Sequence, residues 1–160
     1  LKPSIPINPK DKNISLLYKR MLETVNDPNH KGVGIAAPQI GLNRKVFLVK
    51  RLDKVGEPFE MCINPTITWY SDVTRYGKEG CLSIPGKSDM VYRSLIIRVA
   101  YTDLDGVQKD ETIEGYTAVI FQHEYDHLLG ILYPEQVIKQ KVQTFKPALE
   151  KNELYYLNSN

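Results

Sequence analysis

Apolar residues recur three or four positions apart between Ile14 and Val25, which is the spacing of one face of an α-helix. Asp11 or Asn13 is suited to cap the start of such a helix. The polar, proline-containing stretch 26–30 ends it, because proline and its neighbours disfavour helical backbone. The pattern therefore predicts an amphipathic helix near the start of the chain.

The middle of the chain carries the shorter apolar runs and alternating patterns that are typical of β-strands. Branched and aromatic residues fill these runs, and turn-forming residues separate them. Asp105–Gly106 is a dipeptide typical of a hairpin turn. We expect strands at residues 46–49, 61–63, 66–70, 95–102 and 107–113.

A second helical pattern runs from Tyr116 to Leu129, and Gly130 stands where a helix C-cap belongs. Residues 134–160 are polar and rich in lysine, so we expect one further helix there before a frayed end. Strands placed between two helices favour an α+β fold over an alternating α/β fold. The length suits a single domain over residues 1–160.

Composition and charge narrow the classes of partner. Lysine and arginine number 21 against 19 acidic residues, a net charge of +2, so nothing favours DNA as a partner. No apolar run approaches the roughly 20 residues of a membrane span, and residues 1–8 do not resemble a signal peptide. Two cysteines suit a reducing compartment. We expect a monomer in the cytoplasm of a bacterium, in an organelle or in a phage-infected cell.

The segment His123-Glu124-Tyr125-Asp126-His127 has the strongest chemical signal in the chain. Two histidines four positions apart share one face of a helix, so both imidazoles can bind one metal ion. Glu124 can then reach a water molecule at that ion. The alternative is a solvated polar helix face, but the apolar flanks indicate a buried helix.

A catalytic metal site usually has three protein ligands and one open position. Cys81 is the best candidate for the third ligand, because Gly80 lets the backbone approach closely. The alternative for Cys81 is a small buried core residue. Cys62 lies in an apolar strand and fits the core, whereas His30 lies in a turn-forming cluster and fits the surface.

The segment from Gly32 to Gln39 consists of small residues without a helical period. It lacks the third glycine of a dinucleotide-binding loop and the Lys-Ser/Thr of a P-loop. It suits a wall where the backbone passes close to an extended ligand, with Gln39 offering an amide donor.

Three segments together resemble the peptide deformylase family. With φ for an apolar residue, that family carries G-φ-G-φ-A-A-x-Q, E-G-C-[LM]-S and Q-H-E-x-D-H in this order. Residues 32–39, 79–83 and 122–127 match these motifs at every position. The resemblance covers about residues 1–132 and leaves the tail 133–160 outside it. It implies antiparallel sheets around a central helix bearing the third motif, and removal of the formyl group from the N-terminal formyl-methionine of new polypeptides.

The resemblance also implies a cofactor and catalytic roles. One divalent metal ion is expected, usually Fe2+, with Zn2+, Ni2+ or Co2+ able to take its place. Glu124 would be the general base, and Gln39 with the backbone N–H of Leu82 would form an oxyanion hole. The metal ligands would be Cys81, His123 and His127.

The substrate contacts are a further expectation from the resemblance. The residues pairing with the backbone of an N-formylmethionyl peptide would be Val33, Gly34 and Gly80. The residues lining a methionine pocket would be Tyr116, Val119, Ile120 and His123. Val119 and Ile120 have ordinary core positions as the alternative, and Tyr116 stands where the family pattern leads us to expect an aliphatic residue.

Two further positions bear on the loop around Cys81 and on peptide binding. Glu79 and Arg93 would form a buried pair that holds this loop, the alternative being two unrelated surface charges. Ser88 replaces an arginine with which some relatives grip the peptide further along, so binding beyond methionine is an open question. A weak ribosome contact through the tail lysines competes with a simple solvated face; these lysines are Lys139, Lys141, Lys146 and Lys151.

Two other functions remain open at this point. A metallopeptidase of the H-E-x-x-H class would need a downstream third ligand; no histidine follows His127, but Glu135, Glu150 and Glu153 do. A non-catalytic metal-binding domain would usually close its site with four protein ligands. That scheme gives Glu124 and Gln39 no purpose.

Overall fold

The computed structural model describes residues 3–29, 31–81, 88–131, 146–147 and 155–159. None of the helices in these ranges is long and apolar enough to cross a membrane. The elements are α1 (Ile14–Val25), β1 (Gly34–Ala36), the 3-10 turn η1 (Ala37–Ile40), β2 (Val46–Lys50), β3 (Phe59–Tyr70), β4 (Val73–Cys81), β5 (Ser88–Ser94), β6 (Ile96–Thr102), β7 (Gln108–Glu114), α2 (Gly115–Leu128), β8 (Lys146–Pro147) and β9 (Tyr155–Ser159).

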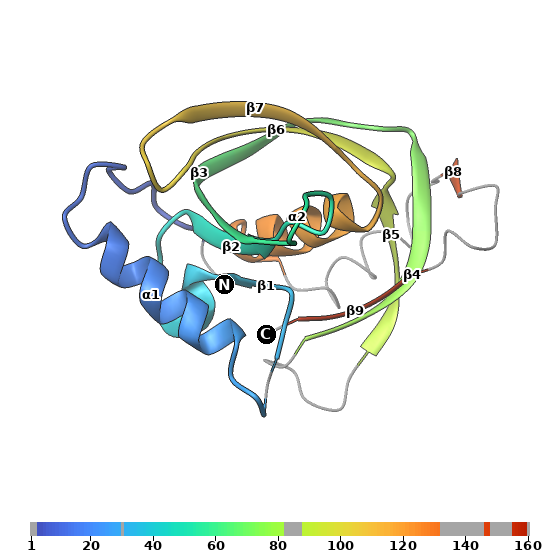
Figure 1. The fold of residues 1–160 in the computed structure, drawn as a ribbon. Helices are drawn as coiled ribbons and strands as arrows, with labels where there is room; N and C mark the ends of the chain where they lie inside the picture. The colour runs from blue at the N-terminus through green and yellow to red at the C-terminus, as the bar shows by residue number, and fades with distance from the viewer. Residues whose placement is uncertain (1–2, 30, 82–87, 132–145, 148–154, 160) are drawn as a thin grey trace.

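The described strands form two sheets around α2 (Figure 1). Five strands pair antiparallel in the order β1-β2-β3-β6-β7, so β1 is an edge strand. In the other sheet β4 pairs antiparallel with β5 and parallel with β8 and β9. This arrangement is the expected α+β fold with a central helix.

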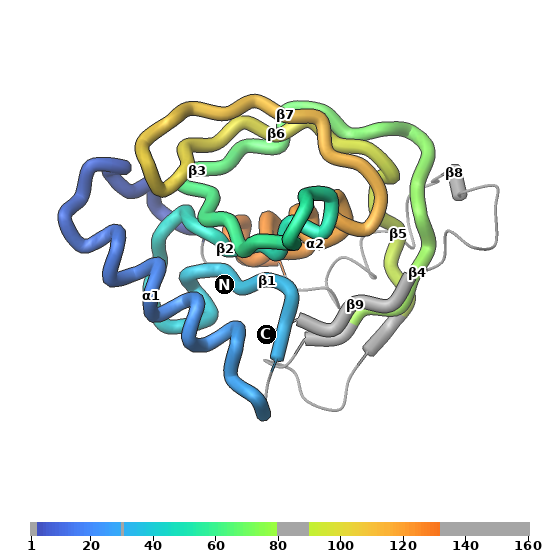
Figure 2. Tube along the Cα trace, viewed as in Figure 1, coloured from blue at the N-terminus to red at the C-terminus, as the bar shows by residue number. Residues whose placement is uncertain are grey.

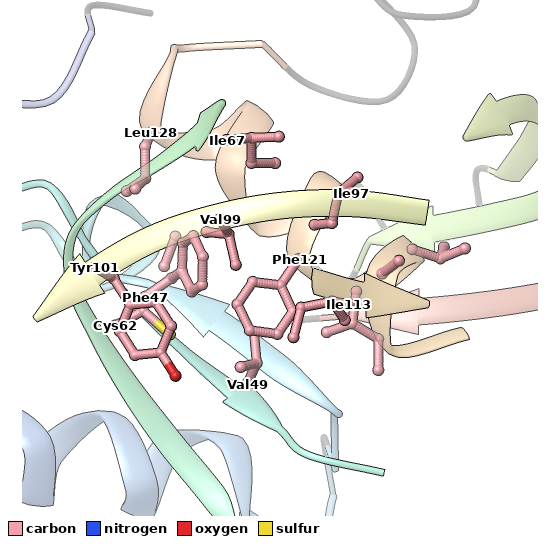
Figure 3. Packing of buried hydrophobic residues seen from close by; sticks show 14 residues of the cluster. Phe47, Val49, Cys62, Ile67, Ile97, Val99, Tyr101, Ile113, Phe121 and Leu128 are labelled. Atoms are coloured by element: carbon pink, nitrogen blue, oxygen red, sulfur yellow. The ribbon is translucent and has the colours of Figure 1, made fainter. Parts of the chain in front are cut away.

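The core between α2 and the larger sheet consists of side chains from both (Figure 3). Phe121 of α2 meets Phe47 of β2 edge to face, with the ring centroids 5.6 Å apart. Val99 of β6 and Ile113 of β7 belong to the same cluster. Because eleven of the fourteen residues of α2 are buried, side chains on nearly every side of this helix are excluded from water.

The helix α1 packs beside β1 and β2, and Figure 2 shows it on the side of these strands away from α2. Its buried residues are Ile14, Leu17, Met21 and Val25, as the spacing predicts. Asn13 is the N-cap but makes no side-chain capping bond. Its N–H instead donates to the Asp11 carboxylate at 2.8 Å.

The prediction of separate strands at 61–63 and 66–70 is wrong, since β3 runs unbroken from Phe59 to Tyr70. A bulge between Ile63 and Thr66 absorbs the irregular residues. Asn64 has φ +50°, a conformation that asparagine tolerates better than most residues. Its side chain accepts from the Ile7 N–H at 2.9 Å and donates to the Ile7 carbonyl at 2.7 Å. The bulge thereby fastens the N-terminal segment to the sheet.

The ends of the second helix and the hairpin before it agree with the sequence. Gly130 has φ +78° and donates its N–H to the His127 carbonyl, as a glycine just beyond a helix does. Gly106 has φ +83° in the turn between β6 and β7. The hairpin turn at Asp105–Gly106 and the C-terminal glycine cap are therefore confirmed.

Two regions differ from the hydrophobic pattern. The pattern indicates no element across residues 73–94, yet β4 and β5 form there and pair from Thr74–Ser94 to Gly80–Ser88. In the tail, the described residues 155–159 form the strand β9 instead of a frayed end. The further helix expected in the tail falls largely on residues outside the described ranges.

Candidate metal centre

The helix α2 brings His123, Glu124 and His127 together. Their candidate ligand atoms all lie within 4.8 Å of one another, and the three side chains are buried. The two Nε2 atoms of the histidines are 3.3 Å apart. A Glu124 oxygen lies 3.9 Å from Nε2 of His127. The spacing of the motif therefore produces a compact group of two imidazoles and one carboxylate.

The ring of His123 is held by Glu79 of β4. Nδ1 of His123 lies 2.6 Å from a Glu79 oxygen. Burial by itself raises the pKa of the Glu79 carboxyl, but the charge of Arg93 and the hydrogen bond from His123 outweigh it and hold this pKa well below its usual range. Glu79 is therefore an ionised acceptor, and Nδ1 of His123 donates to it. Nε2, the other ring nitrogen of His123, faces His127.

This geometry fits a metal ion. Two nitrogens that each bind one tetrahedral Zn2+ at about 2.0–2.1 Å lie about 3.3–3.4 Å apart. The Nε2 atoms of His123 and His127 have this separation. A carboxylate that fixes the second nitrogen of a ligating histidine is also the usual support for such a ligand. The residues present thus suit a divalent cation, whose identity they do not determine.

Arg93 of β5 links Glu79 to Asp126 of the motif. Its Nε and Nη2 donate to the two oxygens of Glu79 at 2.9 and 3.0 Å. Its Nη1 donates to Asp126 at 2.6 Å. Glu79 and Arg93 are thus a buried ion pair in the structure, where a pair of surface charges was the alternative. Asp126, a partner that the sequence analysis missed, closes a ring from α2 through β5 and β4 back to His123.

Gln122 is a second position of the motif whose contacts the sequence analysis missed. Its side-chain oxygen accepts from the Ser94 N–H at 2.8 Å, and its amide nitrogen donates to the Ser94 carbonyl at 2.8 Å. The helix is therefore tied to the end of β5 one residue before His123. The signal that could have identified Gln122 and Asp126 is their presence in the family motif Q-H-E-x-D-H, although H-E-x-x-H chemistry requires neither residue.

The residues expected to meet the substrate backbone lie in two different sheets, at the start of β1 and near the end of β4. The Lys50 N–H donates to the Val33 carbonyl at 2.8 Å, so Val33 faces β2. Because pairing alternates along an antiparallel strand, the N–H and C=O of Gly34 point to the outer side of β1. Gly80 pairs with Ser88 of β5 and with Asn158 of β9. Both sides of β4 are therefore paired at Gly80. A peptide can form strand-like hydrogen bonds with Gly80 only if it displaces β9.

The expected pocket residues lie on α2 between Tyr116 and His123. Val119 and Ile120 are both fully buried and belong to the core cluster, and half-buried Tyr116 packs against it. Burial, with the charge of Glu79, raises the pKa of Tyr116 above its ordinary value. These contacts agree with the alternative in which Val119 and Ile120 are core residues; a role in lining a methionine pocket stays a prediction.

The structure describes some of the residues predicted for the oxyanion hole and the cysteine roles. Gln39 lies in η1, where its side-chain oxygen accepts from the Ala36 N–H at 2.8 Å. The role of its amide nitrogen in an oxyanion hole stays a prediction. Cys81 is the last residue of β4, but its side chain is outside what the structure describes, as are Leu82 and His30. Cys62 is fully buried in the core, as predicted.

Known proteins resemble this chain in sequence and in fold. The family model of polypeptide deformylase matches residues 1–143. A peptide deformylase of Thermotoga maritima is 36% identical over 140 residues, 88% of this chain and 82% of that protein. A crystal structure of peptide deformylase from Thermotoga maritima has TM-score 0.76 and 37% identity, covering 84% of this chain and 88% of that chain.

A probable peptide deformylase from the Synechococcus phage S-SSM7 is similar as well. Its structure has TM-score 0.74 and 34% identity, and the match covers 84% of this chain and 89% of that chain. The family model spans most of the sequence, and the relatives are matched over most of their own length. The chain therefore belongs to the polypeptide deformylase family.

Proposed function

We propose that this chain, a peptide deformylase by family, removes the formyl group from N-formylmethionyl peptides at the site around His123, Glu124 and His127. The observation that carries the proposal is the buried group of two imidazoles and one carboxylate on α2. Glu79 supports it, because its contact with Nδ1 of His123 holds the ring with Nε2 facing His127. We propose that the protein acts where formylated polypeptides are made, in a cytoplasm or an organelle.

The proposed ligand set is Cys81, His123 and His127. Cys81 stands two residues beyond Glu79 in β4. The residues of this set would hold a divalent ion, which we propose to be Fe2+; when bound, it would supply Lewis acidity that lowers the pKa of water and polarises the formyl oxygen. Thiolate and imidazole ligands also accept Zn2+, Ni2+ or Co2+.

The protein's own groups would carry the protons and the developing charge. Glu124 takes one proton from the attacking water, whose oxygen bonds to the formyl carbon. The amide of Gln39 and the N–H of Leu82 donate to the resulting oxyanion, and losing one such donor typically costs about 3–4 kcal/mol. Glu124 then passes its proton to the leaving nitrogen as the C–N bond breaks. The products are formate and a free N-terminus.

The peptide would bind as an added strand. Gly34 faces the outer edge of β1, and strand addition recognises backbone more than side chains. A peptide deformylase of Acinetobacter baumannii with bound Met-Ala-Ser is among the structural relatives, with TM-score 0.75 and 32% identity. We propose that Gly34 pairs with such a peptide and that Val33, whose carbonyl is bound to Lys50, lies beside it. Tyr116, Val119 and Ile120 would lie nearest its methionine. Of the tail lysines, Lys146 lies in β8.

Formate release tests the proposed reaction. Protein prepared without oxygen, or reloaded with Ni2+, is incubated with formyl-Met-Ala-Ser, and acetyl-Met-Ala-Ser and Met-Ala-Ser serve as controls. Release from the formylated peptide alone is the expected result. Absence of release from protein holding about one metal ion per chain would contradict the proposal.

Two variants test the assigned roles. Glu124→Gln is expected to keep the metal and lose turnover, because the amide cannot accept the proton. Cys81→Ala is expected to lose metal during dialysis against a chelator. Undiminished hydrolysis in the first variant, or undiminished metal content in the second, would remove that residue from its role.

A further inference from the structure

Gly34 is a glycine whose backbone does not require one. It is buried in β1, where it lies opposite Val49 of β2. Its φ is not positive, unlike that of Gly41 or Gly106. An alanine could adopt this extended backbone, and a strand usually gains stability when alanine replaces glycine. The reason for a glycine must therefore lie in the space around its Cα.

That space is occupied by the side chain of Glu124. A Cβ added at Gly34 would lie 2.6 Å from Oε2, 3.0 Å from Cγ and 3.1 Å from Cδ of Glu124. Non-bonded carbon atoms meet comfortably only at about 3.5–4.0 Å. A side chain at position 34 and the present position of the Glu124 carboxylate exclude each other.

Neither element can easily move apart from the other. Glu124 is 0% exposed, so its carboxylate has no solvent space to enter. Ile35 and Ala36, the residues after Gly34, are themselves buried and paired with β2. Since packed interiors resist displacement, the strain of a Cβ would fall on the side-chain torsions of Glu124.

We propose that Gly34 is a positioning residue: its missing side chain seats the Glu124 carboxylate against the Cα of β1. The inference rests on the proposed function, in which Glu124 moves the proton. It goes beyond that function because the same residue turns its N–H and C=O to the outer edge of β1, where the peptide would pair. One glycine thus fixes the distance between the base and the bound peptide backbone, by steric contact on one side and pairing on the other.

A cycle of variants separates contact from charge. Gly34→Ala is made in three backgrounds: the natural chain, Glu124→Gln and Glu124→Ala. Glutamine keeps the volume of the glutamate, so the clash persists, whereas alanine removes all three atoms that the new Cβ would meet. The measurements are the midpoint of urea unfolding, metal content, and kcat and KM with formyl-Met-Ala-Ser.

We expect Gly34→Ala to lower the urea midpoint in the natural chain and in Glu124→Gln but not in Glu124→Ala. If the single variant fails to fold, the double variant with Glu124→Ala should be recovered as folded protein. In the natural background we expect full metal content, little change in KM and a fall in kcat of about 100-fold, the typical cost of displacing a catalytic group by about 1 Å.

The same midpoint change in all three backgrounds would overturn the proposal, as would an unchanged kcat. A rise in KM at constant kcat would also overturn it, because that result assigns Gly34 to peptide binding alone. Failure of the natural, metal-loaded protein to release formate would refute the proposed function separately. The unfolding cycle would then still decide whether Gly34 seats Glu124.

Discussion

Replacing Glu79 by glutamine should damage both the fold and the metal site. Within the part of the chain that the structure describes, Glu79 accepts two hydrogen bonds from Arg93 and one from His123. A glutamine can place its oxygen where it accepts from His123 and from Nη2 of Arg93. Its NH2 group must then face Nε of Arg93, donor against donor at about the present 2.9 Å. The variant loses one charge-assisted bond and leaves a buried guanidinium with Asp126 as its remaining carboxylate partner among those described here.

The magnitude follows from the burial of the pair. Removing one partner of a buried ion pair typically costs about 3–5 kcal/mol. With a urea dependence of about 1–3 kcal/mol/M, a loss of about 3 kcal/mol lowers the unfolding midpoint by about 1–3 M. Loss of a carboxylate that orients a ligating histidine typically weakens metal affinity by about 10–100-fold. Both effects are large enough to measure without ambiguity.

The assay is urea unfolding of metal-free and metal-loaded protein, followed by competition with a chelator. Glu23→Gln is the matched control, because it makes the same chemical change on the exposed face of α1. Its effect should stay within about 0.5 kcal/mol. If Glu79→Gln unfolds and binds metal like the control, the chain of bonds from Asp126 to His123 has no energetic role, and the reasoning fails.

Three more predictions concern other parts of the molecule. Asn64→Gly should cost about 1–3 kcal/mol through two lost hydrogen bonds, and Asn64→Ala about 1 kcal/mol more because of its positive φ; equal midpoints in urea would contradict the conformational part. Burial raises the pKa of the Cys62 thiol, so this side chain should resist alkylation by iodoacetamide at pH 8.5 until urea unfolds the protein. Alkylation of Cys62 in the folded protein would refute this prediction. Deleting residues 154–160 removes β9, which pairs with Gly80. If β9 and the peptide compete for Gly80, the deletion should lower KM for formyl-Met-Ala-Ser, since apparent affinity scales with the fraction of open sites. An unchanged or higher KM would exclude this competition.

Local patterns predicted the parts of the fold that depend on local physics. The buried stripe of α1 follows from spacing along one helix, and the meeting of His123 with His127 follows from the helical repeat of four. Glycine at positions 106 and 130 identified a turn and a helix end, because both need positive φ. None of these inferences requires knowledge of a distant residue.

Long-range contacts explain what the sequence left open. β3 continues through Asn64 because the bulge residue binds Ile7, 57 positions away. β4 has too many glycines and charges for a clear alternation, and it is a strand because β5 and β9 pair with it. The contact of Arg93 with Asp126 spans 33 positions. Partners of this kind are set by tertiary packing, which periodicity along the chain does not encode.

The burial of α2 has a consequence for the life of the protein in a cell. Core residues such as Phe121 and both histidines belong to one fourteen-residue helix, so an ion between His123 and His127 and the core beneath it are gained or lost together. An ion that binds the native chain but not the unfolded one stabilises it in proportion to the logarithm of its concentration. Metal starvation would therefore remove the activity and also make the polypeptide more susceptible to proteases. The abundance of the enzyme would follow the supply of its ion.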